Sequence, residues 1–192
     1  MKIAVNTRLL LKNKLEGIGW FTFETLKRIT QAHPEHEFIY LFDRPFAPEF
    51  ITSDNITPIQ TGLPSRHPAL WYLWFEEAVP RALKRTGADM FLSQDGYLSL
   101  RARIPQFLVI HDINFWHKPK DLPRLTSAYY RYFTPRYAHK AGRIATVSQY
   151  SKQDICNSFG VGPEKIDVVY NGVNTQFAPV PQAQQEATRK QY

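Results

Sequence analysis

A histidine and an aspartate stand side by side at the end of an apolar run in the stretch QFLVIHDINFW, residues 106–116. An imidazole titrates near neutral pH, so His111 can hydrogen-bond a hydroxyl or phosphate group or act as an acid or base. Asp112 can contact a ligand, turn the chain or cap the next segment. Two interpretations therefore stay open: a pair that faces a ligand, or a strand end satisfied by backbone groups.

A second group with chemical potential is the glycine pair in LEGIGWF, which precedes a helical pattern. Gly17, Ile18 and Gly19 would let the backbone approach a ligand, and the N-terminus of the following helix offers free N–H groups to a phosphate. The third glycine of a dinucleotide fingerprint is absent, and so is a Walker-type loop. A plain loop-to-helix turn is the alternative.

A third group lies in ATVSQYSKQDI, at a predicted strand-to-helix turn. Ser148 is a good N-cap residue, and Asp154 would follow in the first turns, where the helix dipole favours negative charge. The functional interpretation makes Ser148 and Ser151 ligand contacts and adds Lys152 as an anion contact. Capping alone would also explain the pattern.

Other classes of site are disfavoured by the residues present. The remaining histidines show no metal-ligand spacing, so no metal is expected, and Cys156 is the single cysteine. A G-x-S-x-G hydrolase elbow is absent. No window approaches the roughly 18 apolar residues of a membrane span, and the first apolar run is too short for a signal peptide. These features predict a soluble, cytoplasmic protein.

The charge balance favours an anionic partner. The chain of 192 residues has 24 basic and 17 acidic side chains, a formal charge of +7. Such a balance is typical of contact with a nucleotide, a phosphate, a nucleic acid or an acidic membrane face. The basic residues are scattered along the chain, so a solvated basic surface is the alternative.

Short apolar runs and helical patterns alternate along the chain. The predicted strands cover residues 2–7, 37–42, 56–60, 89–93, 106–110, 144–147 and 166–170, and the predicted helices cover residues 18–31, 68–85, 125–141 and 148–160. This alternation predicts an α/β, Rossmann-like three-layer domain with a mostly parallel sheet. Ligands bind at the carboxyl ends of the strands in such sheets, and the three groups above all lie there.

The predicted helix over residues 68–85 is rich in aromatic side chains. Trp71, Trp74 and Phe75 share one side with smaller apolar residues, which favours core packing over a membrane-dipping or acceptor-gripping face. Pro80 should kink or split this helix, and Gly87 should end it.

Four motifs, in this order, resemble the N-terminal half of a family 4 glycosyltransferase with the GT-B fold: MKIAVNTRLL…EGIGWFTFETLKRI, VIHDINFW, IATVSQYSKQDI and KIDVVYNGVNTQF. The resemblance runs from residue 1 to about residue 179. It implies transfer of a hexose, with retention of configuration, from a nucleotide sugar to a saccharide or lipid-linked acceptor. It implies no metal or other cofactor, and a place in bacterial polysaccharide assembly.

The resemblance also implies roles for particular residues. His111 would face the donor sugar, and Gly17 to Gly19 would lie in the interdomain cleft near the donor phosphates and the acceptor. Arg8 matches an arginine that is common after the first strand of the family. Asn171 and Gly172 match the segment that leads to the interdomain linker and would act as a hinge. The neighbours of the glycine pair, Leu15-Glu16 and Trp20-Phe21, depart from the family pattern.

The resemblance predicts two parts for this chain. Residues 1–177 would form the N-terminal, acceptor-side domain, and residues 178–192 would be a linker or lead-in helix to a C-terminal donor-binding domain. That second domain would supply most of the donor contacts, so the present chain is expected to be inactive alone.

Two rival functions are compatible with such a domain. One is a non-catalytic α/β module that binds an anionic ligand or a partner protein. The other, a dinucleotide oxidoreductase, is disfavoured because the third glycine and the acidic residue at the end of a second strand are missing. We expect no nucleic-acid partner, and a peripheral contact with the inner membrane face stays open.

Overall fold

Seven parallel strands form the sheet of this protein. The computed structural model describes residues 1–62, 64–65, 67–173 and 179–191. The strands are β1 (Lys2–Asn6), β2 (Glu37–Phe42), β3 (Ile56–Gln60), β4 (Met90–Ser93), β5 (Gln106–Val109), β6 (Arg143–Thr146) and β7 (Ile166–Val168). Each lies within two residues of its predicted bounds.

The strand order is β3-β2-β1-β4-β5-β6-β7, and every pairing between these strands is parallel. The chain therefore leaves β1 in one direction, through β2 and β3, and returns to build β4 on the other side of β1. Ile3 of β1 pairs with Phe38 of β2 and with Met90 of β4. The predicted parallel α/β architecture is confirmed.

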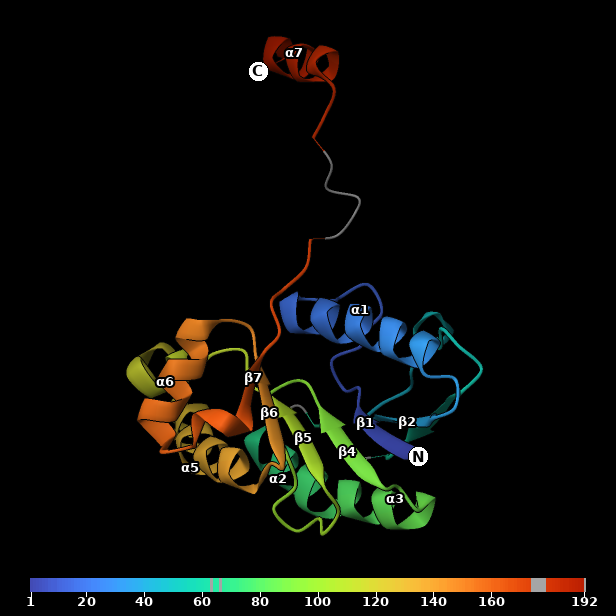
Figure 1. The fold of residues 1–192 in the computed structure, drawn as a ribbon, viewed down its shortest axis with the longest axis vertical. Helices are drawn as coiled ribbons and strands as arrows, with labels where there is room; N and C mark the ends of the chain where they lie inside the picture. Colours follow the sequence, from blue (N-terminus) through green and yellow to red (C-terminus); the bar gives the residue numbers. More distant parts are fainter. Residues whose placement is uncertain (63, 66, 174–178, 192) are drawn as a thin grey trace.

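Helices cover both faces of this sheet (Figure 1). The helices are α1 (Gly17–Ala32), α2 (Pro68–Leu73), α3 (Val79–Thr86), α4 (Asn114–His117), α5 (Arg124–Lys140), α6 (Gln149–Phe159) and α7 (Gln182–Gln191). Short segments are the 3-10 turns η1 (Pro48–Phe50), η3 (Pro119–Asp121) and η4 (Pro163–Lys165) and the π-helical η2 (Trp74–Ala78).

Alternating side chains of each strand enter different cores, because neighbouring residues of a strand point to opposite faces. Ile3 and Val5 pack with Leu26 of α1 on one face. Ala4, between them, belongs to the larger core on the other face, with Trp74 of η2 and Ile155 of α6. This gives three layers, as the sequence predicts.

The predicted aromatic helix is split into α2, η2 and α3, as Pro80 requires. Proline cannot donate the helical hydrogen bond, and the backbone widens into the π-helical segment just before it. Gly87 ends α3 in the left-handed region, with φ of 65°. Trp74 and Phe75 are fully buried, so core packing is the right interpretation for them, whereas Tyr72 is exposed.

Beyond the domain, α7 stands apart from the layered part in Figure 1, and its described side chains are exposed. The predicted boundary between residues 177 and 178 lies outside the described residues. Within the part of the chain that the structure describes, no helix is long and apolar enough to cross a membrane.

Candidate active site

The strand order switches to the other side of β1 at β4, and such a switch point places a crevice at the carboxyl ends of these two strands. Asn6 at the end of β1 reaches across the crevice. Its Nδ2 donates to Oγ of Ser93, at 2.9 Å, and to Oδ1 of Asp95, at 2.7 Å. The two strand ends are therefore joined by side-chain hydrogen bonds as well as by the sheet.

An ion pair between Arg8 and Asp95 forms the floor of this crevice. Nε of Arg8 donates to Oδ2 of Asp95 at 2.5 Å, and the side chains are only 8% and 4% exposed. The guanidinium carbon also lies 4.2 Å from the ring centroid of Tyr97. Burial alone would lower the pKa of Arg8, but the neighbouring Asp95 outweighs it and the pKa is raised. Arg8 is therefore a permanent cation with its counterion in place.

Tyrosines extend this network. The hydroxyl of Tyr97 donates to that of Tyr130 at 2.8 Å. Burial raises the pKa of Tyr97 well above its usual range, and burial raises that of the neighbouring Tyr129 to about 12. These phenols stay neutral at physiological pH and serve as hydrogen-bonding groups rather than as bases.

A hollow of about 600 Å³ opens beside the ion pair. Arg8, Asp95 and Tyr130 line it together with Ile18 from the first turn of α1. Two further cations line it: Lys14 and Arg44. The hollow thus joins the predicted residues Arg8 and Ile18, and its rim is positively charged.

Arg44 is held in place by Asp43. Nε and Nη2 of Arg44 each donate to one oxygen of the Asp43 carboxylate at 2.6 Å. Ser65 donates to the same carboxylate from its backbone N–H and its hydroxyl, both at 2.8 Å. Burial raises the pKa of Asp43, but the bonds from Arg44 and Ser65 lower it more, so the net pKa lies below its ordinary value.

His111 is fixed at the next strand end. Its Nε2 lies 3.0 Å from the carbonyl oxygen of Gln94, which can only accept, so Nε2 carries the proton. Its ring stands edge-on to Phe21 of α1, at 4.8 Å between centroids. Nδ1 makes no hydrogen bond to another described residue and stays available to a ligand. The Nε2 contact therefore fits the interpretation of a strand end satisfied by backbone, and the Nδ1 atom fits the interpretation of a ligand contact.

Gln94 connects this histidine to helix α1, because its Nε2 donates to Oγ1 of Thr25 at 2.9 Å. The loop after β4 thereby joins the His111 segment to the helix that follows the glycine pair. Asp112, in contrast, is exposed, and its Oδ1 accepts from the backbone N–H of Asn114 at 2.9 Å. This contact stabilises the turn that leads into α4.

The two glycines at the start of α1 have different surroundings. A Cβ on Gly19 would lie 3.0 Å from the carbonyl oxygen of Leu9 and 3.1 Å from Cδ2 of Leu15, whereas one on Gly17 would meet nothing within 4 Å. Gly19 is thus required by the preceding loop. Glu16, at the N-cap, makes no side-chain capping bond. The first-turn N–H groups of α1 therefore have no side-chain cap and can meet an anion.

The serines and lysine after β6 have structural partners. Oγ of Ser148 accepts from the backbone N–H of Ser151 at 3.0 Å, so Ser148 caps α6 as predicted. Nζ of Lys152 donates to the carbonyl oxygen of Ile166 at 2.6 Å. The observed lysine contact is therefore within the fold. None of these three residues lines the 600 Å³ hollow.

Asn171 and Gly172 follow β7 and are exposed. Neither lines the hollow. Sequence reasoning also missed residues that do line it, above all Tyr97, Tyr130, Lys14 and Arg44. The aromatic residues resemble core positions in sequence, and the one signal that could have pointed to them is Gly96, a turn residue just before Tyr97.

A cluster with metal-ligand atoms does exist, away from this crevice. One atom each of His33, Glu35 and His36 lies within 4.8 Å of the others, in the turn before β2. That turn is at the amino ends of the strands, opposite the crevice. The expectation that the histidines lack ligand spacing overlooked it, because a short turn can gather residues that have no helical spacing.

With this geometry in view, comparisons with known proteins define the class. The sequence profile of Glycosyltransferase Family 4 matches residues 15–177. The chain belongs to this family. It is 25% identical over 124 residues to the O-antigen chain mannosyltransferase RfbU of Salmonella typhimurium, a match that covers 65% of this chain and 34% of that protein.

Solved structures show the same fold. WaaG, a glycosyltransferase involved in lipopolysaccharide biosynthesis, superposes with a TM-score of 0.63 at 14% identity, over 98% of this chain and 51% of WaaG. Anabaena Alr3699/HepE in complex with UDP and glucose gives a TM-score of 0.59 at 15% identity, over 100% of this chain and 50% of that one. The chain thus spans about half of these GT-B glycosyltransferases, and about a third of the curated relative.

Proposed function

We propose that this chain is the acceptor-side, N-terminal domain of a retaining glycosyltransferase that acts in bacterial polysaccharide assembly. The enzyme would transfer a hexose from a nucleotide sugar to a saccharide or lipid-linked acceptor. The observation that carries this proposal is the convergence, on one sheet edge of a family 4 chain, of the uncapped start of α1 with His111.

The chemistry needs no group beyond the substrates. The bond between the anomeric carbon and the nucleoside diphosphate breaks, and the acceptor hydroxyl oxygen bonds to that carbon on the same face. The acceptor proton leaves with the diphosphate, which departs as an anion. Negative charge therefore develops on the leaving phosphate, and nearby N–H dipoles stabilise it in the transition state.

Each predicted residue has a place in this scheme. The N–H groups at Gly17 and Ile18 would meet a phosphate, and Nδ1 of His111 would accept from a sugar hydroxyl. Arg8 would hold the crevice in shape through Asp95. Lys14 and Arg44 would attract an anionic acceptor, such as one carried on a lipid pyrophosphate. Ser148, Ser151, Lys152 and Asp112 would contribute at the edge of the substrate cleft.

The donor would be held mainly by a second domain, with Asn171 and Gly172 as the hinge. We therefore propose that these 192 residues alone do not support transfer. The proposed place of action is the cytoplasm, at the inner membrane face where a lipid-linked acceptor is met. No metal takes part in the proposed reaction.

A substitution at His111 tests the proposal in the polypeptide that joins this chain to a donor-binding domain. His111→Ala should lower kcat by about 100-fold, the size typical of losing one polar group aimed at a reacting sugar. His117→Ala is the matched control, because His117 is exposed and bonds Asp154 on α6. Unchanged turnover of a nucleotide sugar by His111→Ala would contradict the proposed role.

The competing proposal is a stand-alone module that binds an anionic ligand. The positive rim of the hollow favours it, and calorimetric titration separates the two functions. The transferase proposal predicts weak binding of nucleotide sugars to the 192-residue chain, because most donor contacts lie elsewhere. Tight binding by this chain would support the module instead.

A further inference from the structure

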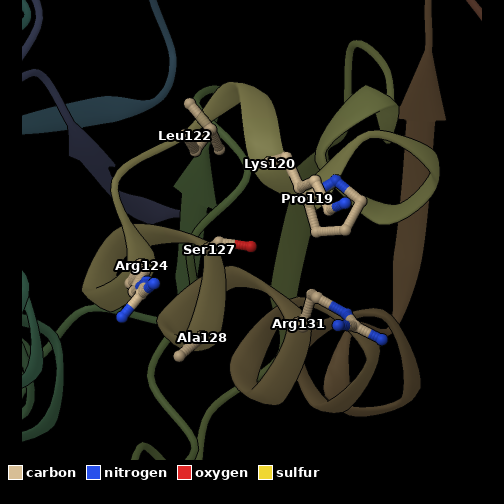
Figure 2. Close-up of a pocket in the computed structure, with 7 residues that line it drawn as sticks. All are labelled: Pro119, Lys120, Leu122, Arg124, Ser127, Ala128 and Arg131. Atoms are coloured by element: carbon tan, nitrogen blue, oxygen red, sulfur yellow. The ribbon is translucent and has the colours of Figure 1, made fainter.

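A second hollow lies outside the crevice, between η3 and the first turns of α5. Its volume is about 380 Å³, and Figure 2 shows the residues that surround it. Pro119 and Leu122 form apolar walls, and three cations line it: Lys120, Arg124 and Arg131. Its lining contains no residue of the 600 Å³ hollow.

The charge of this second hollow is not balanced by carboxylates. Lys120, Arg124 and Arg131 form no salt bridge with any acid in the part of the chain that the structure describes. From residue 118 to residue 140 there are six basic side chains and one acid, Asp121, a net charge of +5. The whole chain has +7, so most of the excess charge lies in this segment, and three of its six cations line the hollow.

A hydroxyl without a hydrogen-bond partner points into the same space. Ser127 is only 6% exposed, and its hydroxyl forms no hydrogen bond with another described residue. Figure 2 shows this hydroxyl turned into the hollow, with Arg124 on one side and Arg131 on the other. Because this hydroxyl has no partner among the described residues, an oxygen of a ligand can accept its hydrogen.

The helix itself adds to this field. The N-cap of α5 is Pro123, which makes no side-chain capping bond, and the first turn contains no acid. The first-turn N–H groups of this 17-residue helix therefore have no side-chain cap. Arg131, one further turn along, stacks on Trp116 with its guanidinium carbon 5.5 Å from the ring centroid. That contact restricts the arginine before any ligand arrives.

We propose that this hollow binds a phosphate group, as a monoester or a diester. Ser127 donates its hydroxyl hydrogen to one phosphate oxygen, and Arg124, Arg131 and Lys120 neutralise the charge. Phosphate suits the site because its several oxygens can meet a hydroxyl and three separate cations together. The site is independent of the proposed transferase chemistry. Its phosphate can come from a soluble metabolite or from a phospholipid headgroup.

Titration of the 192-residue chain with glycerol phosphate tests this site, at constant ionic strength and with chloride as the reference anion. Saturable binding is expected. Ser127→Ala should weaken it by about 5-fold and Arg131→Gln by about 10-fold, as for one hydrogen bond and one charge-assisted bond. Arg136→Gln is the control, since this exposed arginine of α5 lies outside the hollow and should change affinity less than 2-fold.

A second arm identifies the source of the phosphate. Sedimentation with vesicles of phosphatidylglycerol and phosphatidylcholine is compared with phosphatidylcholine alone, for the same variants. Binding to the anionic vesicles that Ser127→Ala and Arg131→Gln weaken supports the site with a headgroup as its ligand, even if glycerol phosphate binds poorly. Saturable glycerol phosphate binding that both changes weaken supports it with a soluble ligand.

The proposal is overturned if neither ligand responds to Ser127→Ala or Arg131→Gln more than to Arg136→Gln. Such a result would mean diffuse attraction to a basic surface. Circular dichroism of each variant checks the fold. Arg124→Gln gives a further test in which no buried atom changes, and it should weaken binding about as much as Arg131→Gln.

Discussion

The guanidinium of Arg8 and the carboxylate of Asp95 meet at 2.5 Å beyond the carboxyl ends of β1 and β4, where the strand order switches to the other side of β1. One residue follows β1 and the other follows β4. Because both side chains are buried, neither can exchange its partner for water. This pair therefore determines how far apart the two loops of the crevice stand.

Breaking this pair should destabilise the protein strongly. Asp95→Asn leaves the Arg8 guanidinium buried without its counterion, which typically costs about 3–5 kcal/mol. Urea unfolding followed by circular dichroism measures it. Glu49→Gln is the matched control, since Glu49 pairs with Lys12 at 3.8 Å with both side chains exposed, and should cost less than about 1 kcal/mol. Equal losses from the two changes would refute this account of the crevice floor.

Substitutions at the two glycines of α1 should have different effects: one on stability through packing, the other on KM through the approach of a ligand. Gly19→Ala places a Cβ against the Leu9 carbonyl and should lower the free energy of unfolding by about 1–3 kcal/mol. Gly17→Ala meets no atom and should leave stability unchanged or raise it by up to about 1 kcal/mol. In the proposed two-domain enzyme, Gly17→Ala should still raise KM, because its methyl group would face the proposed phosphate position. A Gly17→Ala enzyme with normal KM would rule out close backbone approach there.

Ser148 should affect the stability of α6 through its cap. Ser148→Ala is expected to cost about 1 kcal/mol, and Ser148→Asn should restore most of it, because asparagine also accepts from the helix N–H. Gln153→Ala, on the same helix, is the control and should change little. Thermal unfolding of the four proteins gives the comparison. If Ser148→Asn restores stability but not transfer in the proposed two-domain enzyme, then Ser148 has a ligand role as well.

Asp43 should give the protein an acid-sensitive component of stability. Its folded pKa is lowered from an ordinary value near 4, so the stabilisation is complete above about pH 4. It is then lost as the pH falls through the folded value. Asp43→Asn should cost about 1–3 kcal/mol at pH 7, and the difference from the wild type should shrink below pH 4.

Urea unfolding at pH 7 and pH 3 measures this difference. Asp54→Asn, at an exposed carboxylate, is the control and should follow the wild-type pH dependence. A difference for Asp43→Asn that is the same at both pH values would show that the carboxylate charge does not stabilise the Arg44 contact.

The layers of this fold could be predicted from the sequence because each strand is a short apolar run that ends at a polar residue. Buried parallel strands produce that pattern directly. The split at Pro80 and the stop at Gly87 followed from backbone chemistry, which acts locally. Local effects of this kind do not depend on what packs against the segment.

The site was less predictable because its contacts join residues far apart in the chain. Nothing near Arg8 in sequence reveals Asp95, and Tyr130 reaches the crevice from another helix. The cation at Lys152 illustrates a second limit of sequence reasoning. Its charge and position fit an anion contact, but a backbone carbonyl of β7 lies within its reach.

The place of β1 inside the sheet, between β2 and β4, has a consequence for the order of folding during synthesis. Asn6 and its partner Ser93 are 87 residues apart, so β1 leaves the ribosome long before β4 exists. At about 5–20 residues per second, the delay is roughly 4–17 s. Strands β1, β2 and β3 can pair in that interval, with one edge of β1 still unpaired. The crevice floor therefore forms late, because the ion pair with Arg8 can form only after Asp95 has been synthesised.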